Sequence, residues 1–145
     1  VTGDTSIYNY NKVLKKIEDK TFNILPPEQW FDSMEEQGVL FLNTSFTCEL
    51  DGQANSHRKI WNNRNDGFTK KLLEFINKKN PSINWFLWGK EANKCINQTN
   101  LYIPESLIFR SSHPVARLAK NKPDYFLNFS GFSQVTEIDW FGREI

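Results

Sequence analysis

Two polar side chains that could do chemistry follow apolar runs of the sequence. Asn43 comes directly after Val39-Leu40-Phe41-Leu42, and His113 follows Leu107-Ile108-Phe109 after three polar residues. A carboxamide presents a donor and an acceptor together, and an imidazole N–H can stabilise negative charge that develops on an oxygen atom. Taken alone, such an asparagine is more often a turn residue, and such a histidine more often a structural cap. The residue types therefore indicate a ligand site without defining its chemistry.

Three short apolar runs predict the strands that must position these side chains. They cover residues 39–42, 85–88 and 107–109, and continuous apolarity is typical of parallel strands covered on both faces. In a parallel sheet the carboxyl ends of the strands share one edge, and ligands bind there. We therefore expect one site to contain the residues that follow the runs: Asn43-Thr44, Gly89-Lys90 and Ser111-Ser112-His113-Pro114.

Helical patterns lie before and between these runs and predict an α/β fold with right-handed crossovers. The expected helices are residues 7–17, a helix from Pro27 to a turn at Gly38, a helix capped by Asp66, residues 90–96, and a helix that begins at Pro123. The Asp66 helix should bury one apolar stripe, formed by Phe68, Leu72, Leu73, Phe75 and Ile76.

Composition limits the class of protein and of partner. The chain has 145 residues, of which 39% are hydrophobic and 14% aromatic, so it can bury a core as one domain over residues 1–145. The net charge of +1 does not by itself indicate nucleic acid, so phosphate contacts would need a local cluster. Cys48 and Cys95 lack metal-ligand spacing and are expected to be reduced thiols of an intracellular, cytoplasmic protein. No apolar run reaches the length of about 18 residues that a membrane helix needs.

Several short motifs occur together and in the order of a known family. They are Gly38-Val39-Leu40-Phe41-Leu42-Asn43-Thr44, Gln53-Ala54-Asn55-Ser56-His57, Trp61, Phe68-Thr69, Phe86-Leu87-Trp88-Gly89-Lys90, His113-Pro114 and Ile138-Asp139-Trp140. In these motifs the chain resembles the C-terminal two thirds of a family I uracil-DNA glycosylase, and the similarity spans almost the whole chain. The resemblance implies a three-layer αβα fold with a short, mostly parallel sheet.

The resemblance also implies a role for individual residues. Asn43 would read the pairing edge of uracil, and His113 would be the catalytic electrophile that stabilises charge on uracil O2. Ser56 and His57 would hold a DNA phosphate. The alternative, equally open, is that these two residues belong to a solvated loop without a DNA contact. The implied partner is uracil-containing DNA, bound by a monomer in base excision repair. Hydrolysis needs only water, a base and electrophilic support, so no metal or organic cofactor is expected.

The family's catalytic segment, Gly-Gln-Asp-Pro-Tyr-His, does not occur in the chain. Asp4 lies too close to the helix that would start near Ser6 to replace its aspartate. The segment belongs to a central strand of the family's sheet, so we expect a gap beside residues 39–42 and a chain truncated at its N-terminus. The 145 residues by themselves are expected to be inactive unless another segment or subunit fills the gap.

The loop after His113 also departs from the family. His113-Pro114-Val115-Ala116 replaces His-Pro-Ser-Pro, and the loop that wedges a leucine into DNA is shorter. Pro114, Arg117 and Leu118 are the expected DNA contacts, with Arg117 at the wedge position and Leu118 as the alternative wedge. Because flipping a base costs a few kcal/mol, a weaker wedge favours single-stranded DNA or abolishes flipping.

Three functions therefore remain open. The first is a uracil-DNA glycosylase whose missing segment is supplied from elsewhere. The second is a catalytically inactive relative that binds DNA, a nucleotide or a protein partner through the old pocket. The third is a generic α/β interaction domain, in which aromatic residues such as Trp140 and Phe141 form an interface or face the core.

Overall fold

The computed structural model describes residues 10–21, 25–53, 56–63, 65–115 and 125–142. The chain divides into a first unit, made of Val1–Phe41 and Arg117–Ile145, and a second unit, Leu42–Ala116. The single domain over residues 1–145 stays a prediction. Several residues with a predicted role lie outside the described ranges, namely Asp4, Ile7, Arg117, Leu118 and Pro123.

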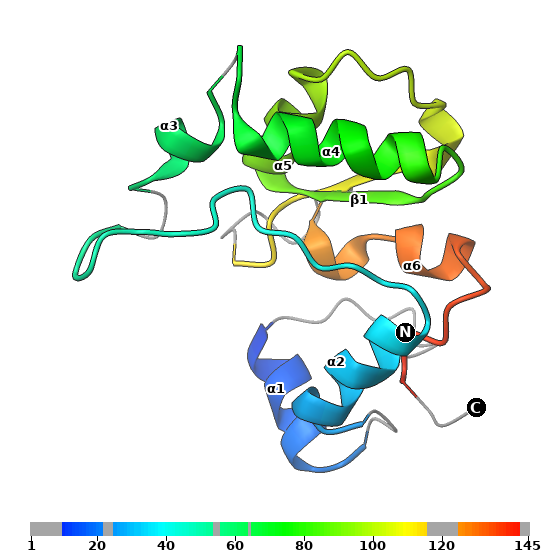
Figure 1. The fold of residues 1–145 in the computed structure, drawn as a ribbon. Helices are drawn as coiled ribbons and strands as arrows, with labels where there is room; N and C mark the ends of the chain where they lie inside the picture. The colour runs from blue at the N-terminus through cyan, green and yellow to red at the C-terminus, as the bar shows by residue number, and fades with distance from the viewer. Residues whose placement is uncertain (1–9, 22–24, 54–55, 64, 116–124, 143–145) are drawn as a thin grey trace. The chain divides into compact units, whose positions relative to one another are not determined.

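The second unit contains a short parallel sheet of two strands. Strand β1, Trp85–Trp88, pairs with β2, Ile108–Ser111, in a register that runs from Trp85 opposite Ile108 to Trp88 opposite Ser111. The helices of this unit are α3 (Arg58–Trp61), α4 (Phe68–Lys79), α5 (Gly89–Asn97) and the 3₁₀ turn η1 (Glu105–Leu107). In Figure 1, α4 and α5 lie together along β1. This arrangement confirms the predicted α/β class with a short parallel sheet.

One apolar cluster joins α4, β1 and α5. Its buried members are Leu73, Trp85, Leu87, Cys95 and Ile96. Burial of a side chain such as Leu or Ile contributes about 1.5–3 kcal/mol, so these few residues supply much of the stability of the second unit. On the other face of the sheet, the rings of Phe86 and Phe109 stack with their centroids 4.9 Å apart. The alternation along β1 therefore gives one face to the helices and the other to a cross-strand aromatic pair.

The predicted strand at residues 39–42 is wrong. Among the residues that the structure describes, the sheet has only the two strands β1 and β2, and residues 39–42 pair with neither. Leu40 is 62% exposed and Leu42 is 40% exposed. An extended segment becomes a strand only when a neighbouring backbone offers the complementary donors and acceptors. Residues 39–42 find no such partner strand among the described residues, and the expected gap beside this segment stays a prediction.

Helix α4 confirms the helix predicted after Asp66, with two corrections. Gly67 is the N-cap residue, while the Asp66 carboxylate pairs with the Lys71 ammonium group instead of capping the helix. The buried positions are Thr69 and Leu73, whereas the predicted stripe residues Phe68 and Phe75 are more than half exposed. Of the predicted stripe, Leu73 and Ile76 pack into the cluster that α4 shares with β1 and α5, so a stripe narrower than predicted fills the contact.

The first unit contains α1 (Tyr10–Glu18), α2 (Pro27–Glu36), the 3₁₀ turn η2 (Phe126–Asn128) and α6 (Gly131–Gln134). Pro27 occupies the first turn of α2, as the sequence predicts, because its missing N–H would have no helical acceptor there. Met34 is fully buried, and Gly38 follows the helix with a φ of +84°, a conformation that favours glycine.

Asp139 and Trp140 are hydrogen-bonded to residues of α2 and its C-cap. The indole Nε1–H of Trp30 donates to the Trp140 carbonyl at 2.9 Å. The Gln37 amide donates to the Asp139 carbonyl at 3.3 Å and accepts the Asp139 N–H at 2.6 Å. The Trp140 ring is half-buried and lies 4.9 Å from the Phe132 ring. Trp140 therefore contributes to the interior of the first unit, which favours the core-facing interpretation over a free interface.

None of the helices in the described ranges combines the length and the apolar content that crossing a membrane requires.

Candidate functional site

His113 lies just beyond the carboxyl end of β2. It follows Ser111 and Ser112, which are both buried, and its own side chain is exposed. The ring Nδ1 accepts the backbone N–H of Val115 at 3.3 Å. In a neutral imidazole only one nitrogen carries a proton, so an accepting Nδ1 places that proton on Nε2. The Nε2–H is then the group that can donate to a negatively charged oxygen.

Gly89 brings the end of β1 against the same histidine. It follows Trp88 at the start of α5 with a φ of +89°, and a Cβ at this position would lie 3.0 Å from the Cβ of His113. Glycine is therefore required both by the backbone conformation and by the close approach. Two of the three predicted strand ends, 89–90 and 111–114, thus come together as the parallel sheet implies.

Asn43 is exposed, and its carboxamide makes no hydrogen bond to any residue that the structure describes. The next residue is anchored: the Thr44 carbonyl accepts the amide of Asn62 at 2.6 Å and the hydroxyl of Thr69 at 3.5 Å. No hydrogen bond joins Asn43 to His113 in the described ranges. A flat slot between the two side chains therefore stays a prediction.

Ser56 and His57 are half-buried, and each already has a partner within its own loop. The Ser56 hydroxyl accepts the Glu49 N–H at 2.8 Å. The His57 Nδ1 lies 2.9 Å from the Thr47 hydroxyl, which also accepts the indole N–H of Trp61 at 2.9 Å. These bonds give both residues a structural role, while their contact with a DNA phosphate stays a prediction. Pro114 is exposed in the turn after His113.

Comparison with known proteins supplies the family. A uracil-DNA glycosylase of Geobacillus kaustophilus is 34% identical over 103 residues, which cover 70% of this chain and 42% of that protein. A uracil-DNA glycosylase of Aliivibrio salmonicida is 32% identical over 126 residues, covering 86% and 52% of the two chains. A uracil-DNA glycosylase of Bacillus thuringiensis is 31% identical over 139 residues, which cover 87% of this chain and 56% of that protein. The chain is a relative of the uracil-DNA glycosylases.

This relationship confirms the resemblance inferred from the motifs. The chain spans about half the length of the curated uracil-DNA glycosylases that it matches. No protein-family model matches the chain. No solved structure matches it either.

A pocket of this uracil-DNA glycosylase relative lies between α3 and α5, and none of the predicted site residues lines it. Its volume is about 130 Å³, and it is lined by Arg58, Lys59, Asn62, Glu91, Lys94, Cys95 and Gln98. Burial, and then the nearby Glu91 carboxylate, raise the pKa of the Cys95 thiol. The protonated thiol donates to the Asn62 carboxamide oxygen at 3.3 Å. No pattern in the sequence predicts this pocket, because its residues come from segments about thirty positions apart and match no motif of the family.

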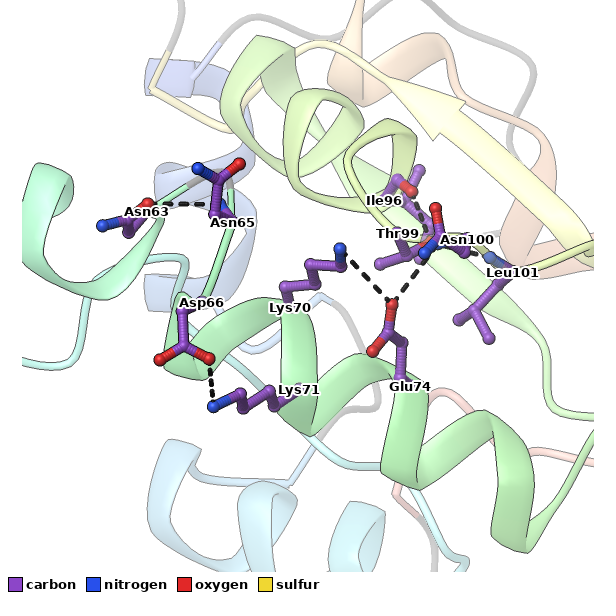
Figure 2. A network of polar contacts seen from close by, with 10 residues as sticks. All are labelled: Asn63, Asn65, Asp66, Lys70, Lys71, Glu74, Ile96, Thr99, Asn100 and Leu101. Carbon is purple, nitrogen blue, oxygen red and sulfur yellow. Dashed lines mark hydrogen bonds and ion pairs between the residues drawn. The ribbon is translucent and has the colours of Figure 1, made fainter.

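Two of the four α4 lysines form ion pairs in this structure. Lys70 lies 4.0 Å from Glu74, and Glu74 also accepts the backbone N–H of Asn100 at 3.3 Å, as Figure 2 shows. Lys71 pairs with Asp66. These contacts tie α4 to the loop after α5. Because the ammonium groups of Lys70 and Lys71 already have carboxylate partners, the lysines of α4 are better interpreted as a solvated helix face than as a DNA-binding patch.

The described residues do not form a metal site. Across the described residues, no three side chains of His, Cys, Asp or Glu lie close enough together to hold a metal ion.

Proposed function

We propose that this chain forms part of a uracil-DNA glycosylase that hydrolyses the N-glycosidic bond of uracil flipped out of DNA. The observation that carries the proposal is the contact of the Val115 N–H with Nδ1 of His113, which leaves Nε2 to carry the proton of a neutral imidazole exposed at the end of β2, in a relative of these enzymes. Such a donor suits a reaction whose leaving group is an anion. The proposed biological role is base excision repair.

The proposed chemistry divides between two side chains of this chain. When the bond between the sugar and uracil breaks, negative charge develops on the uracil ring and partly on its O2. The Nε2–H of His113 would donate to that oxygen, and one such donor stabilises a transition state by about 3 kcal/mol. The free carboxamide of Asn43 would donate to uracil O4 and accept from uracil N3–H. Cytosine presents the opposite pattern, so the same contact would select uracil.

Water must also be activated by a base, and the family's Gly-Gln-Asp-Pro-Tyr-His segment is absent from these 145 residues. The proposal therefore assigns base recognition and electrophilic support to this chain, and the aspartate to a segment outside it. DNA contacts at Ser56, His57, Pro114, Arg117 and Leu118 belong to the same proposal.

A second candidate function is a catalytically inactive relative that binds DNA or a protein partner through the same surface. The replacement of His-Pro-Ser-Pro by His113-Pro114-Val115-Ala116 favours it, because it alters the loop that drives base extrusion. The net charge of +1 also gives little general attraction for DNA.

The test is uracil release from single-stranded and duplex oligonucleotides by the gene product that contains this chain. Asn43→Ala and His113→Ala should each lower the rate by about a hundredfold, the effect of removing one such donor. Asn97→Ala is the matched control, because Asn97 is exposed on α5 and its amide has no partner among the described residues. Unchanged rates in both variants would refute the assignments. Tight binding of uracil-containing DNA without release would establish the second function instead.

A further inference from the structure

A chain of polar contacts runs from η1 through β2 to the start of α5. Glu105 accepts from Arg110 twice, from Nε at 3.3 Å and from Nη2 at 3.4 Å. The third guanidinium nitrogen, Nη1, donates to the carboxamide oxygen of Asn93 at 2.8 Å. The carboxamide nitrogen of Asn93 donates to the Gly89 carbonyl at 2.8 Å. Four residues from three elements are thus joined in one line.

Two residues of this line, Arg110 and Gly89, lie close to His113 in sequence or in space. Arg110 precedes His113 by three residues on β2 and its continuation, and the two serines between them are buried. Gly89 is the residue whose missing Cβ leaves only 3.0 Å to the Cβ of His113. A change in the distance between Arg110 and Gly89 would therefore move the backbone on both sides of the imidazole.

We propose that Asn93 and Arg110 are positioning residues for His113, an inference that rests on the role of His113 in the proposed function. Asn93 suits this role because a carboxamide can accept from a guanidinium and donate to a carbonyl at the same time. An aspartate could only accept, and a leucine could do neither. The sequence shows the two residues seventeen positions apart, and only the fold brings them together.

If Asn93 and Arg110 only stabilised the fold, substituting them would have a different effect on the His113 imidazole. Arg110 is exposed, and exposed ion pairs contribute little to stability. Orientation of a catalytic group is more sensitive, because a small displacement of a donor can cost a large factor in rate. The two roles therefore separate when stability and the state of the imidazole are measured on the same variants.

The experiment is nitrogen NMR of the His113 ring in the ¹⁵N-labelled 145-residue chain. In the unmodified chain, the ring nitrogens should show the Nε2–H tautomer that the Val115 contact implies. Asn93→Leu and Arg110→Gln should each shift both nitrogen signals of His113 and increase the Nδ1–H form, while the midpoint of thermal unfolding changes little. Asn97→Leu, on the same helix and without a polar partner in the described ranges, should leave the signals in place.

The proposal is overturned if the His113 signals of Asn93→Leu and Arg110→Gln match those of Asn97→Leu. It is also overturned if the double variant shifts them by the sum of the single effects, since residues that act through one line of contacts should be non-additive. In the gene product that contains this chain, kcat for uracil release should fall about tenfold in each variant with little change in KM. Absence of uracil release from the unmodified protein would refute the proposed function, whereas the NMR result would still judge the positioning of His113.

Discussion

Residues 39–42 and 85–88 are both runs of four apolar residues, yet only the second run forms a strand. Trp85 and Leu87 are 7% and 6% exposed, whereas Leu40 is 62% exposed. The difference lies in the neighbours of each run. Strand β1 has β2 on one edge and α5 against one face, while residues 39–42 pair with no strand among the described residues. Apolarity thus makes a segment competent to be a strand, and a partner backbone makes it one.

The largest expected effect comes from equal truncations in the two runs. Leu87→Ala should lower the free energy of unfolding by about 3 kcal/mol, because it removes buried methyl groups and leaves a cavity in the cluster. Leu40→Ala should change it by less than about 0.5 kcal/mol, since the side chain is already mostly in water. Urea denaturation followed by tryptophan fluorescence measures both values.

The same two variants also test whether residues 39–42 are unpaired in solution. If Leu40→Ala destabilised the protein as much as Leu87→Ala, residues 39–42 would be packed in solution, and the unpaired state described above would be incorrect.

A smaller effect is expected from the two glycines with positive φ beside these runs. Gly38 precedes residues 39–42 and has open space where a Cβ would lie, whereas a Cβ at Gly89 would meet His113. Gly38→Ala should therefore cost about 1 kcal/mol for the backbone conformation alone. Gly89→Ala should cost about 2 kcal/mol, because the contact with His113 adds to that term.

The two glycine variants are compared in the same denaturation assay, with the NMR signals of His113 as a second measurement. Only Gly89→Ala should move those signals. Equal costs for the two variants and an undisturbed His113 would show that the close approach at the end of β1 has no energetic consequence.

Much of the second unit could be predicted from the sequence, and the reasons are local. The apolar runs at β1 and β2 and the helix after Asp66 are patterns within a few residues, and so is the proline at the start of α2 in the first unit. The pairing of residues 39–42 could not be predicted, because it depends on a backbone elsewhere in space. Asp66 satisfied the composition of an N-cap, but a lysine five residues later competes for its carboxylate.

Only part of the candidate site could be predicted from the sequence. The convergence of the β1 and β2 ends follows from parallel topology, so Gly89 and His113 could be expected to meet. The line from Glu105 to Gly89 could not be expected, since it depends on side-chain reach between α5 and β2. Asn43 lies after the one run that did not become a strand, and its relation to His113 stays a prediction for that reason.

The smallest expected effect concerns Asp66 and Lys71 at the start of α4. The hydrogen bond and charge of Lys71 hold the pKa of the Asp66 carboxyl below its usual range. A lowered pKa in the folded state contributes stability above the ordinary pKa, and that contribution is lost as the pH falls through the folded value. Lys71→Gln should therefore return the Asp66 pKa towards normal and slightly reduce stability at neutral pH.

Carbon NMR titration of the Asp66 carboxyl measures the first effect, and urea denaturation at two pH values measures the second. The stability difference between Lys71→Gln and the unmodified chain should shrink as the pH falls through the lowered pKa of Asp66, and it should vanish once the carboxyl group is protonated in the folded chain as well. A difference that persisted at low pH would have a cause other than this pair, which is largely exposed and should contribute little.

The bonds from α2 to Trp140 and Asp139 connect positions 110 and 102 residues apart in the sequence. On a ribosome that adds about 5–20 residues per second, α2 leaves the exit tunnel many seconds before those partners are made. The second unit is continuous in sequence, so it can fold during that interval, whereas the first unit must wait until Asp139 and Trp140 have been made. The order of synthesis and the order of folding therefore run in opposite directions for this chain: the helix made early is among the last to be completed.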